Sequence, residues 1–310
     1  MKKLPARMEM RLAAVKGLKG VLPPMMTPFR EDGRVDYGMF ERNIDRWNKD
    51  NLAGYLALGS NSEAAYLSEA EKIRLMRLTV GAAKKGRVLL AGTGLESARE
   101  TLRLTEKAAH LGFTAALILT PSYYIDRMDD VALIGYFTFV ADRSPLPVLI
   151  YNVPKYTHVN IPVKVVRELG AHPNIAGMKD SKGDIAQVQA FVDASAPGFK
   201  VIVGSASVWY PAMRFGVTAG IVALANFAGN QCAEIQALFD AGEMNKAESL
   251  HATLLSVNTA ITSTFGVPGL KYAATLAGYE GGHVRLPLRP LDEEAKRAIR
   301  DILLKAGMIG

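Results

Sequence analysis

Residues 116–119 read Ala-Leu-Ile-Leu, and residues 148–151 read Val-Leu-Ile-Tyr. Both runs are continuously apolar, whereas a strand with one face in water alternates apolar and polar residues. Continuous runs of this length are typical of strands that are buried on both faces, as in a parallel sheet covered by helices. These two stretches therefore indicate the class of fold, and the rest of the chain decides its topology.

Similar short apolar runs recur along most of the chain, and a segment with helical spacing follows each of them. The runs that we interpret as strands are 20–26, 54–58, 88–91, 115–119, 148–151, 175–179, 201–204 and 219–224. The helices expected after them are 36–49, 68–84, 97–111, 129–141, 162–169, 184–194, 207–215 and 230–241. Asp36 and Asp184 are suitable N-caps, and Ser68 with Glu71 forms the pattern of a capping box.

A succession of eight strand–helix units predicts a (β/α)8 TIM barrel rather than an open doubly wound sheet, because eight strands close without a free edge. Beyond about residue 240 the pattern is purely helical, over 241–262, 270–276 and 292–306. We therefore expect a basic leader or helix at 1–19, the barrel at 20–240, and a C-terminal helical extension at 241–310.

The composition of the 310 residues excludes several classes of protein. Hydrophobic residues make up 49% and charged residues 22%, which excludes a mostly disordered chain. The single cysteine excludes an internal disulfide framework and a multi-cysteine metal site. No apolar run reaches the length of a membrane span, and no nucleic-acid motif occurs. We expect a cytoplasmic protein with neither a membrane nor a nucleic acid as partner.

The net charge of +7 is concentrated at the start of the chain, because the first 20 residues contain six basic residues and one acidic residue. Residues 7–19 fit a basic amphipathic helix on the surface, and a short organelle-targeting segment would have a similar pattern. The charge of the remaining residues is nearly balanced. The basicity therefore does not indicate a polyanionic partner for the barrel.

Catalytic residues of such barrels lie at the carboxyl ends of the strands. Lys179 ends an apolar strand, where partial desolvation favours the neutral and nucleophilic amine. The alternative for Lys179 is a structural ion pair with Asp180 or Asp184. Tyr151 ends the preceding strand and can move a proton beside a reacting lysine, although a tyrosine in such a place, taken alone, is more often a core residue with a satisfied hydroxyl.

Other strand ends carry weaker signals. Ser60 and Asn61 occupy a turn that can present hydrogen-bond donors to an anion, or they form an ordinary polar loop. Tyr123 and Tyr124 are an aromatic pair in a loop or an interface. The histidines lack metal-ligand spacing, and Gly92-x-Gly94 lacks the third glycine of a dinucleotide fingerprint. We expect neither a metal nor a cofactor.

The motifs at these strand ends resemble those of the pyruvate-dependent class I aldolases, the family that contains dihydrodipicolinate synthase and N-acetylneuraminate lyase. The resemblance extends over about residues 20–281. It rests on six ordered motifs: Pro24-x-x-Thr27-Pro28-Phe29, Gly59-Ser60-x-x-Glu63, Thr120-Pro121-x-Tyr123-Tyr124, Tyr151-Asn152-Val153-Pro154, Gly177-Met178-Lys179-Asp180-Ser181 and Phe265-Gly266-x-Pro268-Gly269-Leu270-Lys271.

The resemblance implies a lyase in which Lys179 forms a Schiff base with a 2-oxo acid and Tyr151 transfers protons. It implies that a tyrosine from a neighbouring subunit completes the proton relay, and Tyr123 matches it, with Tyr124 as the second candidate. Substrate-binding roles are implied for Ser60, Asn61, Thr27, Ser181, Gly204 and Ile221. The family also implies a homotetramer built as a dimer of dimers.

Within this family, the motifs around residues 59–61, 177–184 and 204–206 are most similar to 4-hydroxy-2-oxoglutarate aldolase. We therefore expect cleavage of a 4-hydroxy-2-oxo acid that yields pyruvate. The alternatives are the synthase reaction of pyruvate with aspartate semialdehyde, a 2-oxo-3-deoxy sugar acid aldolase or dehydratase, and a non-catalytic barrel that binds a keto acid.

Two residues depart from the family pattern. Tyr156 stands where the synthase commonly has an arginine that binds a second carboxylate, with Lys155 beside it as a partial substitute. Ser62 stands where a glycine is common, and a serine would strain the turn if that position required a positive φ.

Overall fold

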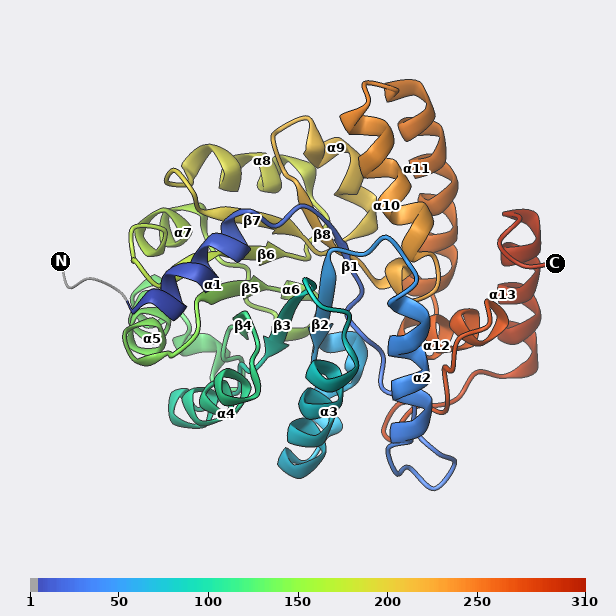
Figure 1. Ribbon diagram of the computed structural model, residues 1–310, viewed down its shortest axis with the longest axis horizontal. Helices are drawn as coiled ribbons and strands as arrows, with labels where there is room; N and C mark the ends of the chain where they lie inside the picture. The colour runs from blue at the N-terminus through green and yellow to red at the C-terminus, as the bar shows by residue number, and fades with distance from the viewer. Residues whose placement is uncertain (1–4) are drawn as a thin grey trace. The chain divides into compact units, whose positions relative to one another are not determined.

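A computed structural model of the chain describes residues 5–310 and contains eight strands (Figure 1). The strands are β1 (Gly20–Leu22), β2 (Gly54–Ala57), β3 (Val88–Gly92), β4 (Ala115–Leu119), β5 (Val148–Asn152), β6 (Ile175–Asp180), β7 (Lys200–Val203) and β8 (Ala219–Ile221). They pair in the order β1-β8-β7-β6-β5-β4-β3-β2. Pro24, just after β1, forms a parallel bridge with Leu56 of β2, so the order closes on itself. The predicted (β/α)8 topology is confirmed.

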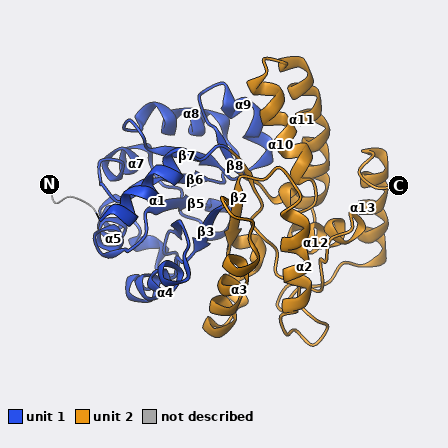
Figure 2. Ribbon diagram, in the orientation of Figure 1, with its two compact units in different colours: residues 1–19, 88–220 blue, residues 20–87, 221–310 orange. Residues whose placement is uncertain are grey.

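The chain divides into two compact units, which Figure 2 shows in different colours. The first unit contains residues 1–19 and 88–220, and the second contains residues 20–87 and 221–310. Helices of the first unit are α1 (Ala6–Lys16), α4 (Ala98–Leu111), α5 (Asp130–Arg143), α6 (Pro154–Thr157), α7 (Val163–Leu169), α8 (Ile185–Ala194) and α9 (Trp209–Met213). Helices of the second unit are α2 (Tyr37–Trp47), α3 (Glu69–Ala82), α10 (Gly229–Asp240), α11 (Met244–Asn258), α12 (Gly266–Leu276) and α13 (Glu293–Lys305).

The core of the first unit is built by β4, β5 and β6, in which every residue but Leu119 is buried. Helices α4, α5, α7 and α8 pack against one another in chain order (Figure 1). This arrangement explains the continuous apolar runs, because strands of such a sheet are buried on both faces.

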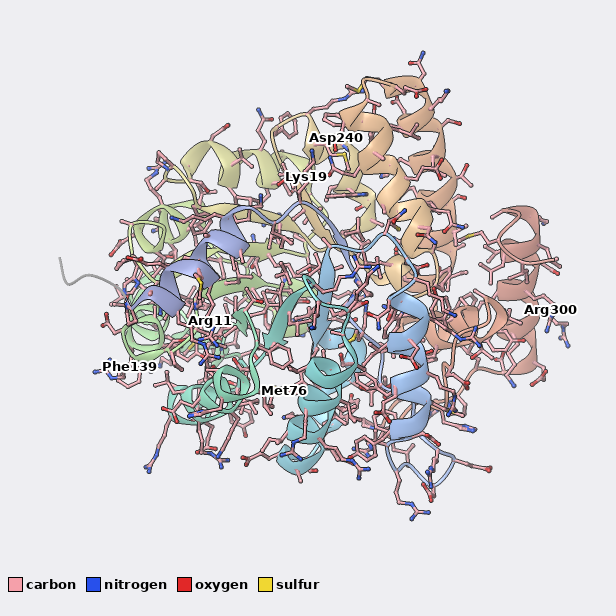
Figure 3. The ribbon with its side chains drawn as sticks, viewed as in Figure 1. Arg11, Lys19, Met76, Phe139, Asp240 and Arg300 are labelled. Atoms are coloured by element: carbon pink, nitrogen blue, oxygen red, sulfur yellow. The ribbon has the colours of Figure 1, made fainter. Side chains whose placement is uncertain are left out.

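Helix α1 forms where the basic segment predicted a helix. Leu12 and Val15 on this helix are buried. The guanidinium of Arg11, labelled in Figure 3, donates hydrogen bonds to the carbonyl oxygens of Pro145 and Ala109, each at 3.1 Å. The helix is therefore docked on the first unit. Lys2 and Lys3, at the start of the predicted leader, lie outside the described residues.

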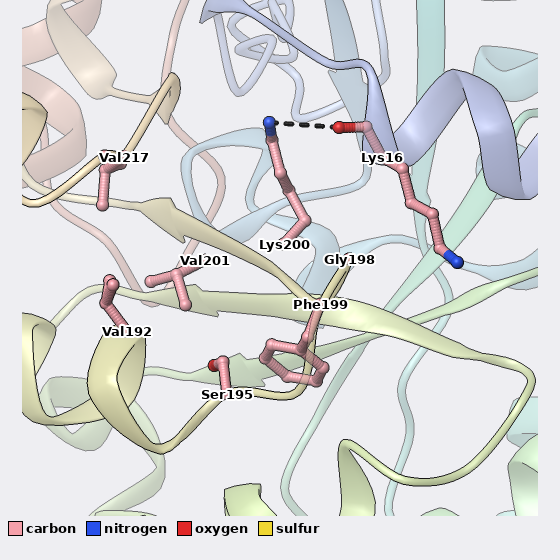
Figure 4. A pocket seen from close by; sticks show the side chains of 9 residues that line it. Lys16, Val192, Ser195, Gly198, Phe199, Lys200, Val201 and Val217 are labelled. Carbon is pink, nitrogen blue, oxygen red and sulfur yellow. Dashed lines mark hydrogen bonds between the residues drawn. The ribbon is translucent and has the colours of Figure 1, made fainter.

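A cavity of about 240 Å³ lies at the amino ends of strands in the first unit (Figure 4). It is lined by Lys16 of α1, by Lys200 at the start of β7, and by Val217 just before β8, among others. The Lys200 amine donates to the carbonyl oxygen of Lys16 at 3.3 Å. Lys179 is the penultimate residue of the neighbouring strand β6, whereas Lys200 begins β7, so this cavity opens toward the strand ends opposite to the expected catalytic end.

The predicted helix caps are confirmed. Asp36 accepts a hydrogen bond from the backbone N–H of Met39, and Asp184 caps α8. Ser68 and Glu71 form the complete capping box of α3.

The C-terminal helices differ from the expected boundaries. Helix α11 ends at Asn258 and continues as a π-helical turn over Thr259–Ser263. Helix α12 begins at Gly266, four residues earlier than expected. Pro268 lies in its first turn, where backbone N–H groups have no partner inside the helix, so the proline is tolerated there.

Asn226 fastens the segment after β1 within the second unit. Its side-chain oxygen accepts from the Met26 N–H at 3.0 Å, and its amide group donates to the oxygens of Pro24 (3.1 Å) and Ala223 (3.0 Å). Because Asn226 is buried, its removal leaves these backbone groups without partners.

We predict that Asn226→Ala lowers the free energy of unfolding by about 1–3 kcal/mol, because buried polar groups lose their hydrogen bonds. Urea unfolding measures this change. The control is Asn230→Ala, whose side chain bonds Asn51 and Asp50 at the surface and should cost less than about 1 kcal/mol. Equal losses in the two variants would contradict the role of Asn226.

Candidate active site

Lys179 is the penultimate residue of β6, and only 4% of it is exposed. Its parallel register partner on β5 is Tyr151. Partners in register lie side by side on the same face of the sheet, and the Lys179 Nζ is 4.1 Å from the centroid of the Tyr151 ring. The predicted nucleophile and the predicted proton carrier are therefore in contact.

Lys179 forms no ion pair within the described residues, so the alternative of a structural pair is wrong. Asp184 binds Lys182 instead, at 3.0 Å. Asp180 points to the opposite face of β6, where its Oδ1 accepts from the side-chain amide of Asn152 at 2.6 Å. An amine buried without a carboxylate partner is the environment in which lysine acts as a nucleophile.

Gly204 makes room for the Lys179 side chain. A Cβ at this position would lie 2.7 Å from the Cε of Lys179 and 1.9 Å from the Oγ of Ser181, which is too close for either atom. The Gly204 N–H donates to the carbonyl oxygen of Asp180 at 2.6 Å and fixes the close approach. The Ser181 Oγ is buried and has no hydrogen-bond partner among residues 5–310. Lys179, Ser181 and Gly204 thus lie together, and the substrate-binding roles of Ser181 and Gly204 stay predictions.

Tyr123 lies on the loop after β4 and is 78% exposed. Its ring packs edge-on against Tyr124, with centroids 5.0 Å apart. Glu96 holds the loop by accepting hydrogen bonds from the backbone N–H groups of Ser122 (2.9 Å) and Tyr123 (3.1 Å). The exposure of the pair suits a contact with another chain, and the role of Tyr123 stays a prediction.

The remaining predicted residues belong to the second unit. Thr27 follows β1 and is fully buried, and no partner for its Oγ1 is found in the described part of the chain. Ser60 and Asn61 are half-buried in a short 3-10 helix, Ser60–Ser62, directly after β2. Ile221 ends β8 and is buried. Each residue therefore lies at or just beyond a strand end.

Ser62, which stands where a glycine is common in the family, does not strain the turn, because its own φ is not positive. The positive φ of 53° falls on the next residue, Glu63, and Ser62 is absent from the left-handed region. The Ser62 hydroxyl donates to the carbonyl oxygen of Met25, a bond that glycine could not make.

Glu63 and Lys271 form a buried ion pair that the sequence analysis did not find. The Lys271 Nζ lies 2.6 Å from the Glu63 Oε1, and only 1% of Lys271 is exposed. Burial lowers the pKa of Lys271 to about 8, while the charge of Glu63 opposes this shift. The Glu63 Oε2 accepts from the Arg285 N–H at 2.9 Å. The pair therefore holds Glu63 in its left-handed conformation, directly after Ser60–Ser62.

The described residues contain no group of three His, Cys, Asp or Glu side chains that could hold a metal ion. No helix in the described part of the chain is long and apolar enough to cross a membrane.

The sequence profile of the Dihydrodipicolinate synthetase family matches residues 17–306. This chain belongs to that family. Its activity is that of a lyase. A family protein of Methanothrix thermoacetophila named 4-hydroxy-tetrahydrodipicolinate synthase is 32% identical, with 93% of this chain and 96% of that protein covered. The protein of the same name from Methanoculleus marisnigri is 33% identical, with 93% and 99% covered.

Solved structures of family proteins agree with the fold. A dihydrodipicolinate synthase from Bacillus anthracis is 29% identical with a TM-score of 0.88, and 93% of this chain and 98% of that chain are covered. A prophage protein of E. coli K12, solved in complex with pyruvate, is also 29% identical with a TM-score of 0.88, and 94% and 99% are covered. The family is thus shown, whereas the more specific expectation of 4-hydroxy-2-oxoglutarate aldolase is not confirmed.

The two buried lysines of this enzyme lead to a prediction about stability. Lys271→Met removes the cation that pairs with the buried Glu63 carboxylate, which keeps only its bond from the Arg285 N–H, and should cost about 3–5 kcal/mol of unfolding free energy. Combining it with Glu63→Gln should recover part of this loss. Lys179→Met is the matched control, because no carboxylate loses its partner, and it should be neutral or stabilising. Urea unfolding measures the free energy of unfolding of each variant. A decrease in Lys179→Met as large as that in Lys271→Met would show that Lys179 has a structural ion pair.

Proposed function

We propose that the enzyme activates pyruvate, or a pyruvate-yielding 2-oxo acid, as an imine on Lys179. The observation that carries this proposal is the Lys179 amine, which is buried, has no counter-ion among residues 5–310, and lies against the Tyr151 ring. Such an amine can attack a keto carbon, and the resulting imine serves as an electron sink without a metal.

The steps follow from this chemistry. The lone pair of Lys179 Nζ attacks C2 of pyruvate, and a proton moves from the nitrogen to the former keto oxygen. Tyr151 delivers a second proton to this hydroxyl, which leaves as water and gives the protonated imine. The Tyr151 phenolate then takes a proton from C3, which yields the enamine. C3 of the enamine attacks the aldehyde carbon, and Tyr151 returns the proton to the aldehyde oxygen, which becomes a hydroxyl while the protonated imine re-forms. In the cleavage direction, Tyr151 removes the proton of the C4 hydroxyl and the C3–C4 bond breaks, which releases the aldehyde. The enamine is then protonated and hydrolysed.

The supporting roles are proposals of the same kind. Ser181 and Gly204 adjoin Lys179, which supports their place beside the bound keto acid. The resemblance assigns the pyruvyl carboxylate to Ser60 and Asn61, a supporting hydrogen bond to Thr27, an apolar wall to Ile221, and a relay from a neighbouring copy to Tyr123. These assignments stay predictions, as does the tetramer.

For the second reactant, the names of the relatives favour condensation of pyruvate with aspartate semialdehyde. One observation favours cleavage of 4-hydroxy-2-oxoglutarate as the second candidate. Tyr156, on α6, stands where the synthase commonly has an arginine, and a phenol cannot bind a carboxylate through two parallel N–H groups. Lys155, whose Nζ lies 5.9 Å from the Tyr156 ring centroid, is the nearest substitute on this helix.

The covalent step is tested by borohydride reduction in the presence of pyruvate. We expect mass spectrometry to find one pyruvyl group, on Lys179. Lys179→Arg should remove the adduct, because the guanidinium is always protonated and is no nucleophile. An adduct on another lysine, or none in the folded protein, would refute the proposal.

The second reactant is tested by assaying both reactions with one preparation. We expect kcat/KM for condensation to exceed that for cleavage of 4-hydroxy-2-oxoglutarate by about tenfold or more, and Tyr156→Arg to increase condensation further. Faster cleavage would establish the second candidate instead. Stabilisation by pyruvate without either turnover would indicate a barrel that binds a keto acid without catalysis.

A further inference from the structure

A second polar pair lies directly beyond Tyr151 and Lys179 on the same two strands. Asn152 of β5 is the register partner of Asp180 of β6. Because side chains alternate between the faces of a strand, this pair points away from the Lys179 amine. Both residues are fully buried. The structure thus places an amide and a carboxyl behind the catalytic pair, one residue further along each strand.

The side chain of Asn152 makes three hydrogen bonds. Its amide group donates to the Asp180 Oδ1 at 2.6 Å and to the Asn160 Oδ1 at 2.9 Å. Its oxygen accepts from the Ile161 N–H at 3.0 Å. Tyr151 is the preceding residue, so the position of its ring depends on how the Asn152 backbone is held.

Asp180 is the centre of this group. Its Oδ1 also accepts from the Gln187 side chain of α8, at 3.2 Å. Its Oδ2 is buried without a hydrogen-bond partner in the described chain. Burial raises the pKa of the Asp180 carboxyl, against the bonds from Asn152 and Gln187. Since a buried carboxyl with one unused oxygen is costly, stability alone does not explain its presence.

We propose that Asp180 is a positioning residue that, through Asn152, holds Tyr151 against the amine of Lys179. This inference rests on the proposed function of those two residues. Asp180 touches neither substrate nor the reacting atoms. Its acceptor oxygen fixes the end of β5 relative to β6. A displacement of about 1 Å at a reacting group can cost on the order of 100-fold in rate, so a bond behind the site can control the reaction.

The experiment measures the rate constant of imine formation at saturating pyruvate, with borohydride quenching and mass spectrometry. We expect Asp180→Ala to lower it about 10–100-fold, with little change in the pyruvate concentration for half-saturation. Asp180→Asn keeps an acceptor oxygen of the same shape and should stay within about threefold of the unchanged enzyme.

Coupling to Tyr151 separates positioning from general damage. If Asp180 acts by placing the Tyr151 hydroxyl, Asp180→Ala should have almost no further effect in a Tyr151→Phe background, because that hydroxyl is gone. The matched control is Asn174→Ala at the other end of β6. Asn174 is also buried and donates to the Ala141 oxygen at 2.9 Å, so its loss should lower the melting temperature without slowing imine formation.

Three results would overturn the inference. The first is an unchanged rate constant of imine formation in Asp180→Ala, and the second is an equal decrease in Asp180→Ala and Asp180→Asn. The third is a double variant, Asp180→Ala with Tyr151→Phe, whose rate decreases by the product of the two single effects. If Asp180→Ala does not fold, Gln187→Ala takes its place in the experiment. This variant removes one hydrogen-bond donor to Asp180 from a half-buried position on α8. It should then give a smaller loss that also vanishes in the Tyr151→Phe background. Absence of a Lys179 adduct in the unchanged enzyme would instead refute the proposed function.

Discussion

The parallel pairing of β5 with β6 is the constraint on which the catalytic arrangement depends. The register sets Tyr151 opposite Lys179 and Asn152 opposite Asp180. Because the strand period is two residues, one pair faces the Lys179 amine and the other faces away. A shift of β6 by one residue would set Asp180 opposite Tyr151 and place a carboxyl where the proposed nucleophile lies. The bond between Asn152 and Asp180 therefore fixes the same register on which the contact of Lys179 with Tyr151 relies.

Lys179 and Lys271 show how the surroundings of a buried lysine can differ within one protein. Lys271 has a carboxylate partner at 2.6 Å and fastens the segment that follows β2. Lys179 has an aromatic face at 4.1 Å and, within the described residues, no carboxylate. Replacing a lysine lowers stability strongly when the buried carboxylate paired with it loses its partner. Replacing a lysine that has no counter-ion leaves no such charge behind. Stability is thus served by the first lysine, and the second is left available for chemistry.

The fold and the position of Lys179 could be predicted from sequence because both follow from local patterns. Continuous apolar runs mark strands buried on both faces, and a lysine at the end of such a run is conspicuous. The bond between Asp180 and Asn152 and the ion pair of Glu63 with Lys271 were not predicted. Their partners lie 28 and 208 residues apart, and only the folded chain brings them together. The ion pair of Lys271 had one signal in the sequence, because apolar residues surround this lysine on α12. A lysine in such a segment is buried, and a buried lysine needs a partner. The π-helical turn after Asn258 could not be predicted, because the spacing of apolar residues over 241–262 indicated one continuous helix.

In the mechanism that we propose, β5 and β6 present Tyr151 to a covalent intermediate on Lys179. A crystal structure of the enzyme reduced with borohydride in the presence of pyruvate tests it most directly. We expect continuous density from the Lys179 Nζ to C2 of the pyruvyl group, with the Tyr151 hydroxyl within hydrogen-bond distance of the adduct. Density on another residue, or a Tyr151 ring turned away from an adduct on Lys179, would contradict it.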